Sequence, residues 1–214
     1  MALLLFYITD RRQFPGDRQE QERRLLEKIS ECAAAGVEMI QLREKDLEVR
    51  SLEELGQKAI AALGDSPARL LMNSRTDVAL ACGAHGVHLP ANDMAASDVR
   101  AVFMRAGVSA PMIGVSTHSV AEVASAEAHG ADFAVFAPVF EKARAASRDG
   151  LEQLRRICHR TEAAQPPMPV LALGGITLEN AQLCVSAGAA GIAAIRLFQQ
   201  GNVETVVRKL RGSV

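Results

Sequence analysis

The chain has 214 residues, of which 49% are hydrophobic and 23% charged, and its formal net charge is −1. The length and apolar content suit one large domain or two small ones, and the balanced charge with few aromatic residues argues against a nucleic-acid partner. No stretch approaches the roughly 18 consecutive apolar residues of a membrane span, and the four cysteines form no C-x-x-C pair. We therefore expect a cytoplasmic protein with reduced thiols and no membrane partner.

Strand and helix signals alternate along the whole chain. Apolar runs bounded by turn residues predict strands at residues 3–9, 37–42, 68–72, 86–89, 111–115, 132–136, 169–173 and 191–195. Helical periodicity and capping signals predict helices at about 18–35, 51–63, 76–82, 97–105, 119–129, 151–163, 178–187 and 203–210. A loose loop is expected at residues 141–149.

The predicted helix boundaries rest on capping residues. Ser51 is followed three residues later by Glu54, and Ser119 by Glu122, which is the spacing of a capping box at a helix N-terminus. Several predicted helices end at a small residue followed by glycine, as at Gly36, and an apolar run begins directly afterwards. Each such junction is typical of a helix that returns the chain to the next strand.

Eight strand–helix units in this length, with no shift in composition and no long linker, predict a (β/α)8 TIM barrel formed by a single domain, residues 1–214. The alternative is an open, doubly wound sheet that binds a nucleotide at one switch point. That alternative is less favoured, because no G-x-G-x-x-G follows the first strand and eight units are many for that fold.

Charged residues follow the second predicted strand. Gln41, Arg43 and Lys45 stand at alternate positions, so on a strand their side chains would share one face. An amide, a guanidinium and an ammonium that converge at a strand end suit an anion with several oxygens, such as a phosphate or diphosphate. A solvated strand end with ordinary surface charge is the alternative.

Polar residues also follow other predicted strands, and in a barrel these ends share the active-site face. They are Asn73, Asp93, Ser116, Thr117, His118, Gly174 and Gly175. Asp93 could bind Mg²⁺ or cap the next helix, and His118 could transfer protons or satisfy loop backbone. The two glycines, with Thr177 at a helix start, could bind a phosphate or only form a tight turn. His88, without metal-ligand spacing, is interpreted as structural.

The chain resembles the thiamine-phosphate synthase / TenI family over nearly its whole length. The matching motifs are YITD at Tyr7–Asp10, QLREKD at Gln41–Asp46, MNSRTDVAL at Met72–Leu80, GVHLP at Gly86–Pro90, IGVSTHS at Ile113–Ser119, PVF at Pro138–Phe140, LGGIT at Leu173–Thr177 and AGAAGIAAI at Ala187–Ile195. This resemblance implies a TIM barrel of thiamine biosynthesis. Its synthases join a hydroxymethylpyrimidine diphosphate to a thiazole phosphate with Mg²⁺, whereas its TenI branch includes thiazole tautomerases that need no metal.

The resemblance also implies roles for particular residues. Arg43, Lys45 and His118 are the implied catalytic residues, and Asp93 and Ser74 the implied Mg²⁺ ligands. The implied substrate-binding residues are Gln41, Leu42, Arg43, Glu44, Lys45, Asn73, Ser116, Gly174, Gly175, Ile195 and Arg196. The partners are therefore small-molecule substrates, and the oligomeric state stays open, with a homo-oligomer as one option.

Three departures from the synthase pattern bear on the activity. Ser74 stands where a second aspartate is expected, the loop after Phe140 lacks the expected threonines and aligned lysine, and Arg196 replaces a serine. Lys142 or Arg144 could substitute for the loop lysine, and Arg196 could hold a phosphate by its charge. We predict a synthase, because the complete cationic stretch has little use in a tautomerase; a tautomerase or a non-catalytic binding relative is the alternative.

Overall fold

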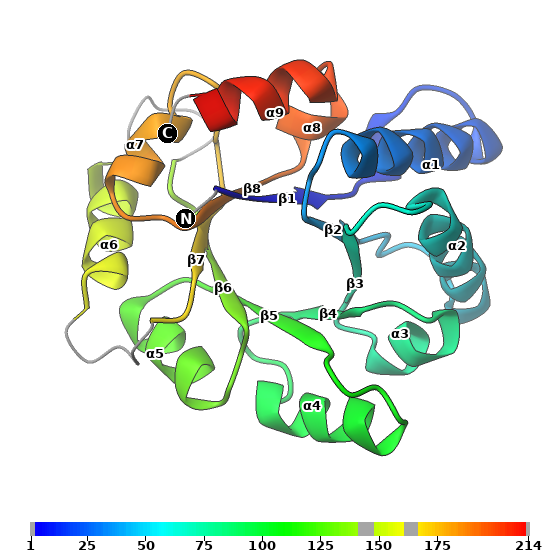
Figure 1. The fold of residues 1–214 in the computed structure, drawn as a ribbon, viewed down its shortest axis with the longest axis horizontal. Coiled ribbons are helices and arrows are strands. Elements are labelled where there is room, and N and C mark those ends of the chain that lie inside the picture. The colour runs from blue at the N-terminus through cyan, green and yellow to red at the C-terminus, as the bar shows by residue number, and fades with distance from the viewer. Residues whose placement is uncertain (1–2, 141–147, 161–166, 213–214) are drawn as a thin grey trace.

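The computed structural model describes residues 3–140, 148–160 and 167–212. Within these residues, parallel strands form a closed barrel in chain order, with β1 hydrogen-bonded to β8, and helices surround it (Figure 1). The strands are β1 (Leu4–Ile8), β2 (Met39–Leu42), β3 (Arg69–Asn73), β4 (Gly86–Leu89), β5 (Met112–Thr117), β6 (Phe133–Phe136), β7 (Val170–Ala172) and β8 (Gly191–Ala194). The predicted (β/α)8 barrel is confirmed, and the open doubly wound sheet is excluded.

The helices follow the predicted order with a few differences at their ends. They are η1 (Arg11–Gln13, a 3₁₀ turn), α1 (Arg18–Ala34), α2 (Val49–Ala62), α3 (Thr76–Cys82), α4 (Ala96–Arg105), α5 (Val120–Ala128), α6 (Arg148–Cys158), α7 (Ala181–Ser186), α8 (Arg196–Gln199) and α9 (Val203–Gly212). The sequence did not predict η1 or α8, because a single turn has too few residues to show helical periodicity. Among the described residues, no helix is long and apolar enough to span a membrane.

Of the two predicted capping boxes, the one at Ser119 supplies the N-cap hydrogen bond, while the Glu122 carboxylate accepts from the His118 backbone N–H. At the start of α5, the Ser119 hydroxyl accepts from the Glu122 backbone N–H at 3.2 Å. The box predicted at Ser51 is wrong, because α2 begins two residues earlier at Val49 and Ser51 lies inside its first turn. A helix can begin before a good cap when packing of its apolar face contributes more than the cap hydrogen bond.

The strands divide their side chains between two apolar layers, as the period-2 alternation requires. On β1, Leu5 and Tyr7 pack with the helix layer, whereas Phe6 and Ile8 belong to a separate cluster inside the barrel. The buried members of that inner cluster are Phe6, Ile8, Met39, Leu71, Phe133, Val135, Leu171 and Ala193. This apolar interior is the floor on which the polar residues at the strand ends lie.

Gly114 on β5 shows how closely the floor is packed. A Cβ at this position would lie 2.2 Å from the Phe133 ring, so only glycine leaves room for that ring. Phe133 in turn contacts Phe6 edge-on, with ring centroids 5.5 Å apart, and stacks against His88 at 6.1 Å. The aromatic rings of Phe6 and Phe133 therefore pack against the His88 imidazole, where the apolar interior meets the polar residues.

Candidate active site

Four polar side chains form a continuous row across β2, β3, β4 and β5. The Gln41 amide nitrogen donates to Asn73 Oδ1 at 2.9 Å, and Gln41 Oε1 lies 2.9 Å from His88 Nδ1. His88 Nε2 lies 3.2 Å from the Ser116 hydroxyl. Gln41, Asn73 and Ser116 are three of the residues that the sequence placed at the barrel mouth, and the structure brings them together through His88.

His88 is fully enclosed at the centre of this row. Burial, with a smaller contribution from the Arg43 charge, lowers the pKa of His88 to about 3. The imidazole is therefore neutral at physiological pH and can donate from one nitrogen while accepting at the other. The interpretation of His88 as structural is incomplete, because its two nitrogens connect three predicted site residues.

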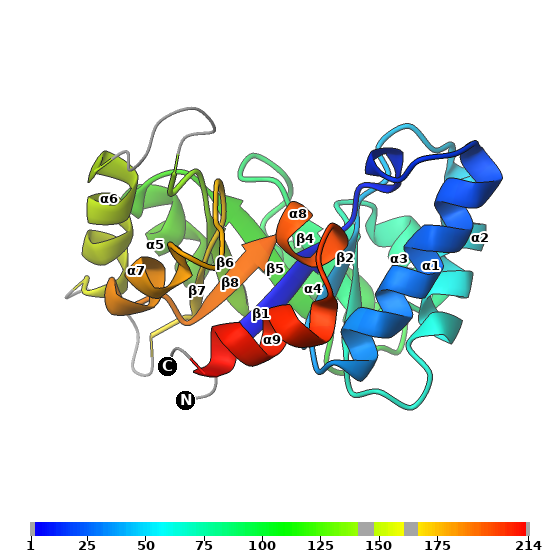
Figure 2. The ribbon, with the colours of Figure 1, turned by 90° about the horizontal axis from the view of Figure 1, so that it is seen from above.

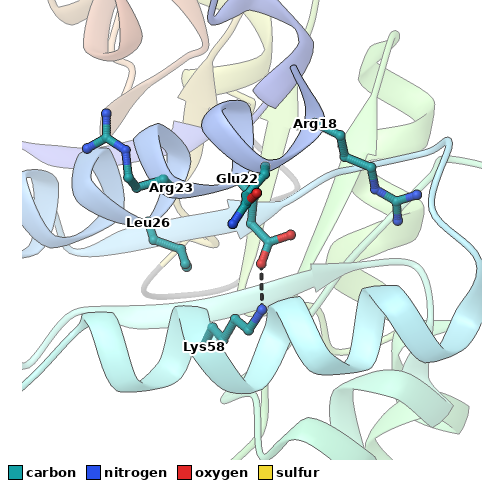
Figure 3. Close-up of a pocket in the computed structure, with 6 residues that line it drawn as sticks. Arg18, Glu22, Arg23, Leu26 and Lys58 are labelled. Carbon is teal, nitrogen blue, oxygen red and sulfur yellow. Dashed lines mark hydrogen bonds and ion pairs between the residues drawn. The ribbon is translucent and has the colours of Figure 1, made fainter. Parts of the chain in front are cut away.

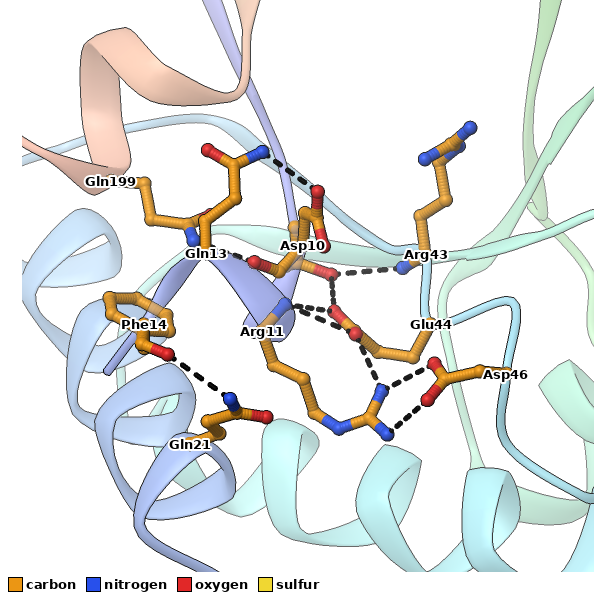
Figure 4. A network of polar contacts seen from close by, with 10 residues as sticks. Asp10, Arg11, Gln13, Phe14, Gln21, Arg43, Glu44, Asp46 and Gln199 are labelled. Carbon is orange, nitrogen blue, oxygen red and sulfur yellow. Dashed lines mark hydrogen bonds and ion pairs between the residues drawn. The ribbon is translucent and has the colours of Figure 1, made fainter. Parts of the chain in front are cut away.

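Two cations lie beyond the end of β2 with no ion pair among the described residues. Arg43 is half-buried, its backbone N–H donates to Thr9 Oγ1 at 2.9 Å, and its side chain extends away from the neighbouring polar network (Figure 4). Lys45 is exposed in the turn that follows. The strand ends at Leu42, so the predicted strand alternation does not extend to Lys45. Both cations are available to an anion.

Leu42 and Glu44 are placed differently from the expectation that they bind substrate. The Leu42 side chain is buried in the layer between barrel and helices. Glu44 is buried and accepts hydrogen bonds from Thr9 Oγ1 at 2.7 Å and from Arg11 Nη1 at 2.9 Å (Figure 4). Asp46 receives a bidentate contact from the same guanidinium, at 2.8 and 2.7 Å. The contacts of Arg11 with Glu44 and Asp46 therefore connect the ends of β1 and β2.

Ser74 and Asp93 meet at the mouth of β3 and β4. The Ser74 hydroxyl donates to Asp93 Oδ2, while Asp93 Oδ1 accepts from the Met94 backbone N–H at 2.8 Å. Ser74 has a positive φ of 64°. One exposed carboxylate with a neutral hydroxyl beside it fits Mg²⁺, because this ion is usually held by one or two carboxylates together with substrate phosphate oxygens. No group of three acidic, His or Cys ligands occurs in the described residues.

A cavity of about 650 Å³ lies between the ends of β7 and β8, of the size expected for a small-ligand site. Gly174 (φ 102°) and Gly175 (φ 63°) line it, together with Ile195 and Arg196. Arg196 is exposed and forms no ion pair within the described residues. Two glycines and an arginine around one cavity suit a phosphate group.

Thr177 lines this cavity, but the expected helix start at this residue is wrong. Its backbone N–H donates to Asn180 Oδ1 at 2.8 Å, and α7 begins only at Ala181 and is six residues long. Neither a free Thr177 N–H nor a helix dipole therefore points to the cavity. Gly174 and Gly175 have positive φ angles, and a Cβ at either position would lie within 3.0 Å of the loop after β6. Glycine at both positions therefore leaves the backbone exposed on this side of the cavity.

His118 lies just past β5, apart from the polar row. Its Nδ1 lies 2.7 Å from the Ala137 carbonyl, and its backbone N–H donates to Glu122 Oε2 at 2.7 Å. A carbonyl can only accept, so Nδ1 carries the proton and Nε2 is left as the basic atom. The side chain is exposed. This geometry suits a proton acceptor, although among the described residues no hydrogen bond or ion pair joins His118 to the other predicted site residues.

Lys142 and Arg144, which could replace the family's loop lysine, fall outside the described residues. A groove between α1 and α2 is lined by Arg18, Glu22, Arg23, Leu26 and Lys58, and Glu22 pairs with Lys58 at 2.6 Å (Figure 3). This groove lies on the outer helix layer, and the ion pairs of Glu22 with Lys58 and of Arg23 with Glu27 indicate a solvated helix surface.

Comparison with known proteins gives a consistent result. Residues 5–198 match a family model described as thiamine monophosphate synthase. A relative from Geobacter sulfurreducens is 42% identical over 195 residues, which is 89% of this chain and 84% of that protein. The thiamine-phosphate synthase of Syntrophomonas wolfei is 34% identical over 97% of this chain and 94% of its own length. The solved structure of the thiamine phosphate pyrophosphorylase from Pyrococcus furiosus is 31% identical in sequence. The match covers 99% of this chain and 95% of that chain, with a TM-score of 0.78.

Proposed function

We propose that this chain, which belongs to the thiamine monophosphate synthase family, joins a hydroxymethylpyrimidine diphosphate to a thiazole phosphate and releases diphosphate. The observation that carries the proposal is that two cations, Arg43 and Lys45, closely follow Gln41 of the polar row and have no ion pair among the described residues. A diphosphate needs several cationic contacts, and the attached heterocycle needs hydrogen-bonding groups beside them. The mouth of β2 and β3 supplies both.

Separate groups of residues bind the diphosphate, the pyrimidine ring and the thiazole phosphate. Arg43 and Lys45 bind the diphosphate and stabilise the negative charge that builds on it as its bond to the pyrimidine methylene carbon breaks. Gln41, Asn73 and Ser116 orient the pyrimidine ring. The cavity formed by Gly174, Gly175, Ile195 and Arg196 holds the thiazole phosphate, whose ring nitrogen bonds to the same methylene carbon. Holding both partners in one barrel mouth turns a bimolecular encounter into a positioned reaction.

The residues at Asp93 and Ser74 would hold a Mg²⁺ ion beside the diphosphate. When bound, the metal neutralises charge on the leaving group. Asp93 contributes the one carboxylate of this pair and Ser74 a neutral oxygen, so the substrate phosphates must supply most of the remaining charge. Metal binding at this site therefore depends on the diphosphate more strongly than it would at a site with two carboxylates.

The direct test supplies both substrates with Mg²⁺ and measures thiamine phosphate and released diphosphate. Formation of both in equal amounts supports the synthase, and loss of turnover with EDTA supports the metal. A protein that binds both substrates without forming product would contradict the proposal. The thiazole tautomer alone, supplied in a separate reaction, tests the second candidate below.

Replacing Ser74 with aspartate is expected to lower the Mg²⁺ concentration for half-maximal rate by about tenfold, because a second carboxylate adds charge to the site. Aspartate also tolerates the positive φ of 64° at this position. The measurement is the Mg²⁺ dependence of the initial coupling rate. Ser74→Ala is the matched control, since it removes the hydroxyl without adding charge. An unchanged Mg²⁺ dependence in Ser74→Asp would show that this residue is not beside the metal.

Thiazole tautomerisation is the second candidate function, and the His118 geometry is the observation that favours it. With Nδ1 donating to the Ala137 carbonyl, Nε2 has no hydrogen bond among the described residues and can accept a proton from a substrate carbon. If the chain is a tautomerase, His118→Ala abolishes conversion of the thiazole tautomer and EDTA has no effect. If it is a synthase, the same substitution lowers coupling by less than about tenfold, because departure of diphosphate requires no histidine base.

A further inference from the structure

The proposed synthase mechanism assigns no role to His88, although it is a buried polar side chain in the site. Its side chain lies on β4 between the aromatic rings of Phe6 and Phe133, with centroids 5.4 and 6.1 Å away. Only 3% of the residue is exposed. Burying an imidazole costs free energy that an apolar residue of similar size would not cost, unless the ring's hydrogen bonds have a use.

The hydrogen bonds of the polar row run in one direction. Gln41 donates its amide N–H to Asn73, so its oxygen faces His88 and must accept from Nδ1–H. The neutral ring then has an unprotonated Nε2, which must accept from the Ser116 hydroxyl. Every bond in the row is fixed once His88 is protonated at Nδ1. A ring protonated at Nε2 would require Gln41 and Ser116 to reverse their roles.

We propose that His88 is a positioning residue, which fixes the direction of hydrogen bonding in the row and thereby sets what the row offers to the pyrimidine substrate. The two ends of the row then differ. The Asn73 amide nitrogen makes no hydrogen bond within the described residues and is a free donor, whereas the Ser116 oxygen keeps lone pairs that can accept. The substrate class, a pyrimidine diphosphate, rests on the proposed function.

The neighbouring Arg43 supports this role. Burial is the larger cause that lowers the pKa of His88 to about 3, and the positive charge of Arg43 also disfavours protonation of the ring. A protonated ring would donate from both nitrogens and would force the Ser116 hydroxyl to turn its proton outward. The site thus keeps its donor and acceptor ends across the whole physiological pH range.

Kinetics of two His88 variants test the proposal. His88→Leu removes both ring nitrogens, and we expect kcat/KM for the pyrimidine diphosphate to fall by about 10- to 100-fold. KM for the thiazole phosphate should stay within about twofold, since that substrate is bound on β7 and β8. His88→Asn keeps an N–H donor near the Nδ1 position and should recover most of the loss. His129→Gln, an exposed histidine on the helix layer, is the matched control. Equal losses in the leucine and asparagine variants, or equal losses for both substrates, would overturn the proposal.

A spectroscopic measurement tests the same inference without activity. In the unliganded full chain labelled with ¹⁵N-histidine, NMR should show His88 protonated at Nδ1 only, from pH 5 to pH 8. A ring protonated at Nε2, or one that titrates in this range, would overturn the assigned direction. This result is independent of substrate. Absence of coupling by the wild-type chain would refute the proposed function, and the NMR measurement would still decide the orientation of the row.

Discussion

Replacing Arg43 with alanine is expected to lower kcat/KM for thiamine phosphate formation by about 10- to 100-fold or more, the largest kinetic loss of any single substitution at the mouth. Arg43 has no carboxylate partner among the described residues, so its charge is available to the diphosphate. A charge-assisted hydrogen bond to a phosphate is worth about 1.5–3 kcal/mol. The loss should appear mainly in kcat, because charge on the diphosphate increases as it departs.

Two further variants make this prediction sharper. Arg43→Lys keeps the charge but loses the planar fork, and should recover only part of the rate. Arg105→Ala removes an exposed arginine from the last turn of α4, and should leave kcat/KM unchanged. Initial coupling rates at saturating Mg²⁺ provide the measurement. Coupling that is indifferent to Arg43 and to EDTA would refute the synthase assignment.

The largest expected effect on stability is that of Glu44→Ala, which should lower the free energy of unfolding by about 3 kcal/mol. Glu44 accepts from the Arg11 guanidinium and backbone and from Thr9, and its side chain is 1% exposed. Removing the carboxylate takes away the acceptor of the Thr9 hydroxyl and of the Arg11 backbone N–H in the interior. Asp46 still contacts Arg11, at 2.7 Å, which keeps the loss at the lower end of the range for buried ion pairs.

Urea denaturation of the full chain measures this loss. Glu27→Ala is the matched control: Glu27 pairs with Arg23 on the exposed face of α1, and its removal should cost less than about 0.5 kcal/mol. A double variant, Arg11→Met with Glu44→Leu, should be less destabilised than the sum of the single changes, because it leaves no buried charge unpaired. Strict additivity would contradict a direct interaction between Arg11 and Glu44.

The barrel could be predicted from the sequence because its signals are local and repeated. Each strand is a short apolar run, and glycines such as Gly36 and Gly83 mark the ends of the preceding helices. Polar residues at strand ends, Gln41 and Asn73 among them, then had to meet at one face because parallel strands share an orientation. Periodicity and turn residues are sufficient to predict the barrel and its active-site face, because these signals do not depend on which side chains contact each other.

The contacts between side chains could not be predicted, because they depend on three-dimensional neighbours. In the sequence, Glu44 is one of several charges after β2, and nothing marks it as the partner of Arg11, which is 33 residues away. His88 had a weaker signal. It stands one position before the end of β4, in phase with the inward-facing residues, but a lone histidine gives no indication of two hydrogen-bonded neighbours. Short elements such as α8 were missed for a different reason, because four residues are too few to show helical periodicity.

The seam between β1 and β8 has a consequence for how the chain folds during synthesis. Gln199 accepts from the Tyr7 hydroxyl at 3.1 Å and donates to the Asp10 carbonyl at 2.7 Å, across 192 and 189 residues of sequence. Of the barrel strands, β1 is synthesised first, and one of its edges pairs with β8, which is synthesised last (Figure 2). Before β8 is synthesised and paired, the nascent sheet has two edges with unpaired backbone groups, and these edges can pair with other chains. Ring closure is thus a late, non-local step, and the growing chain needs protection until it occurs.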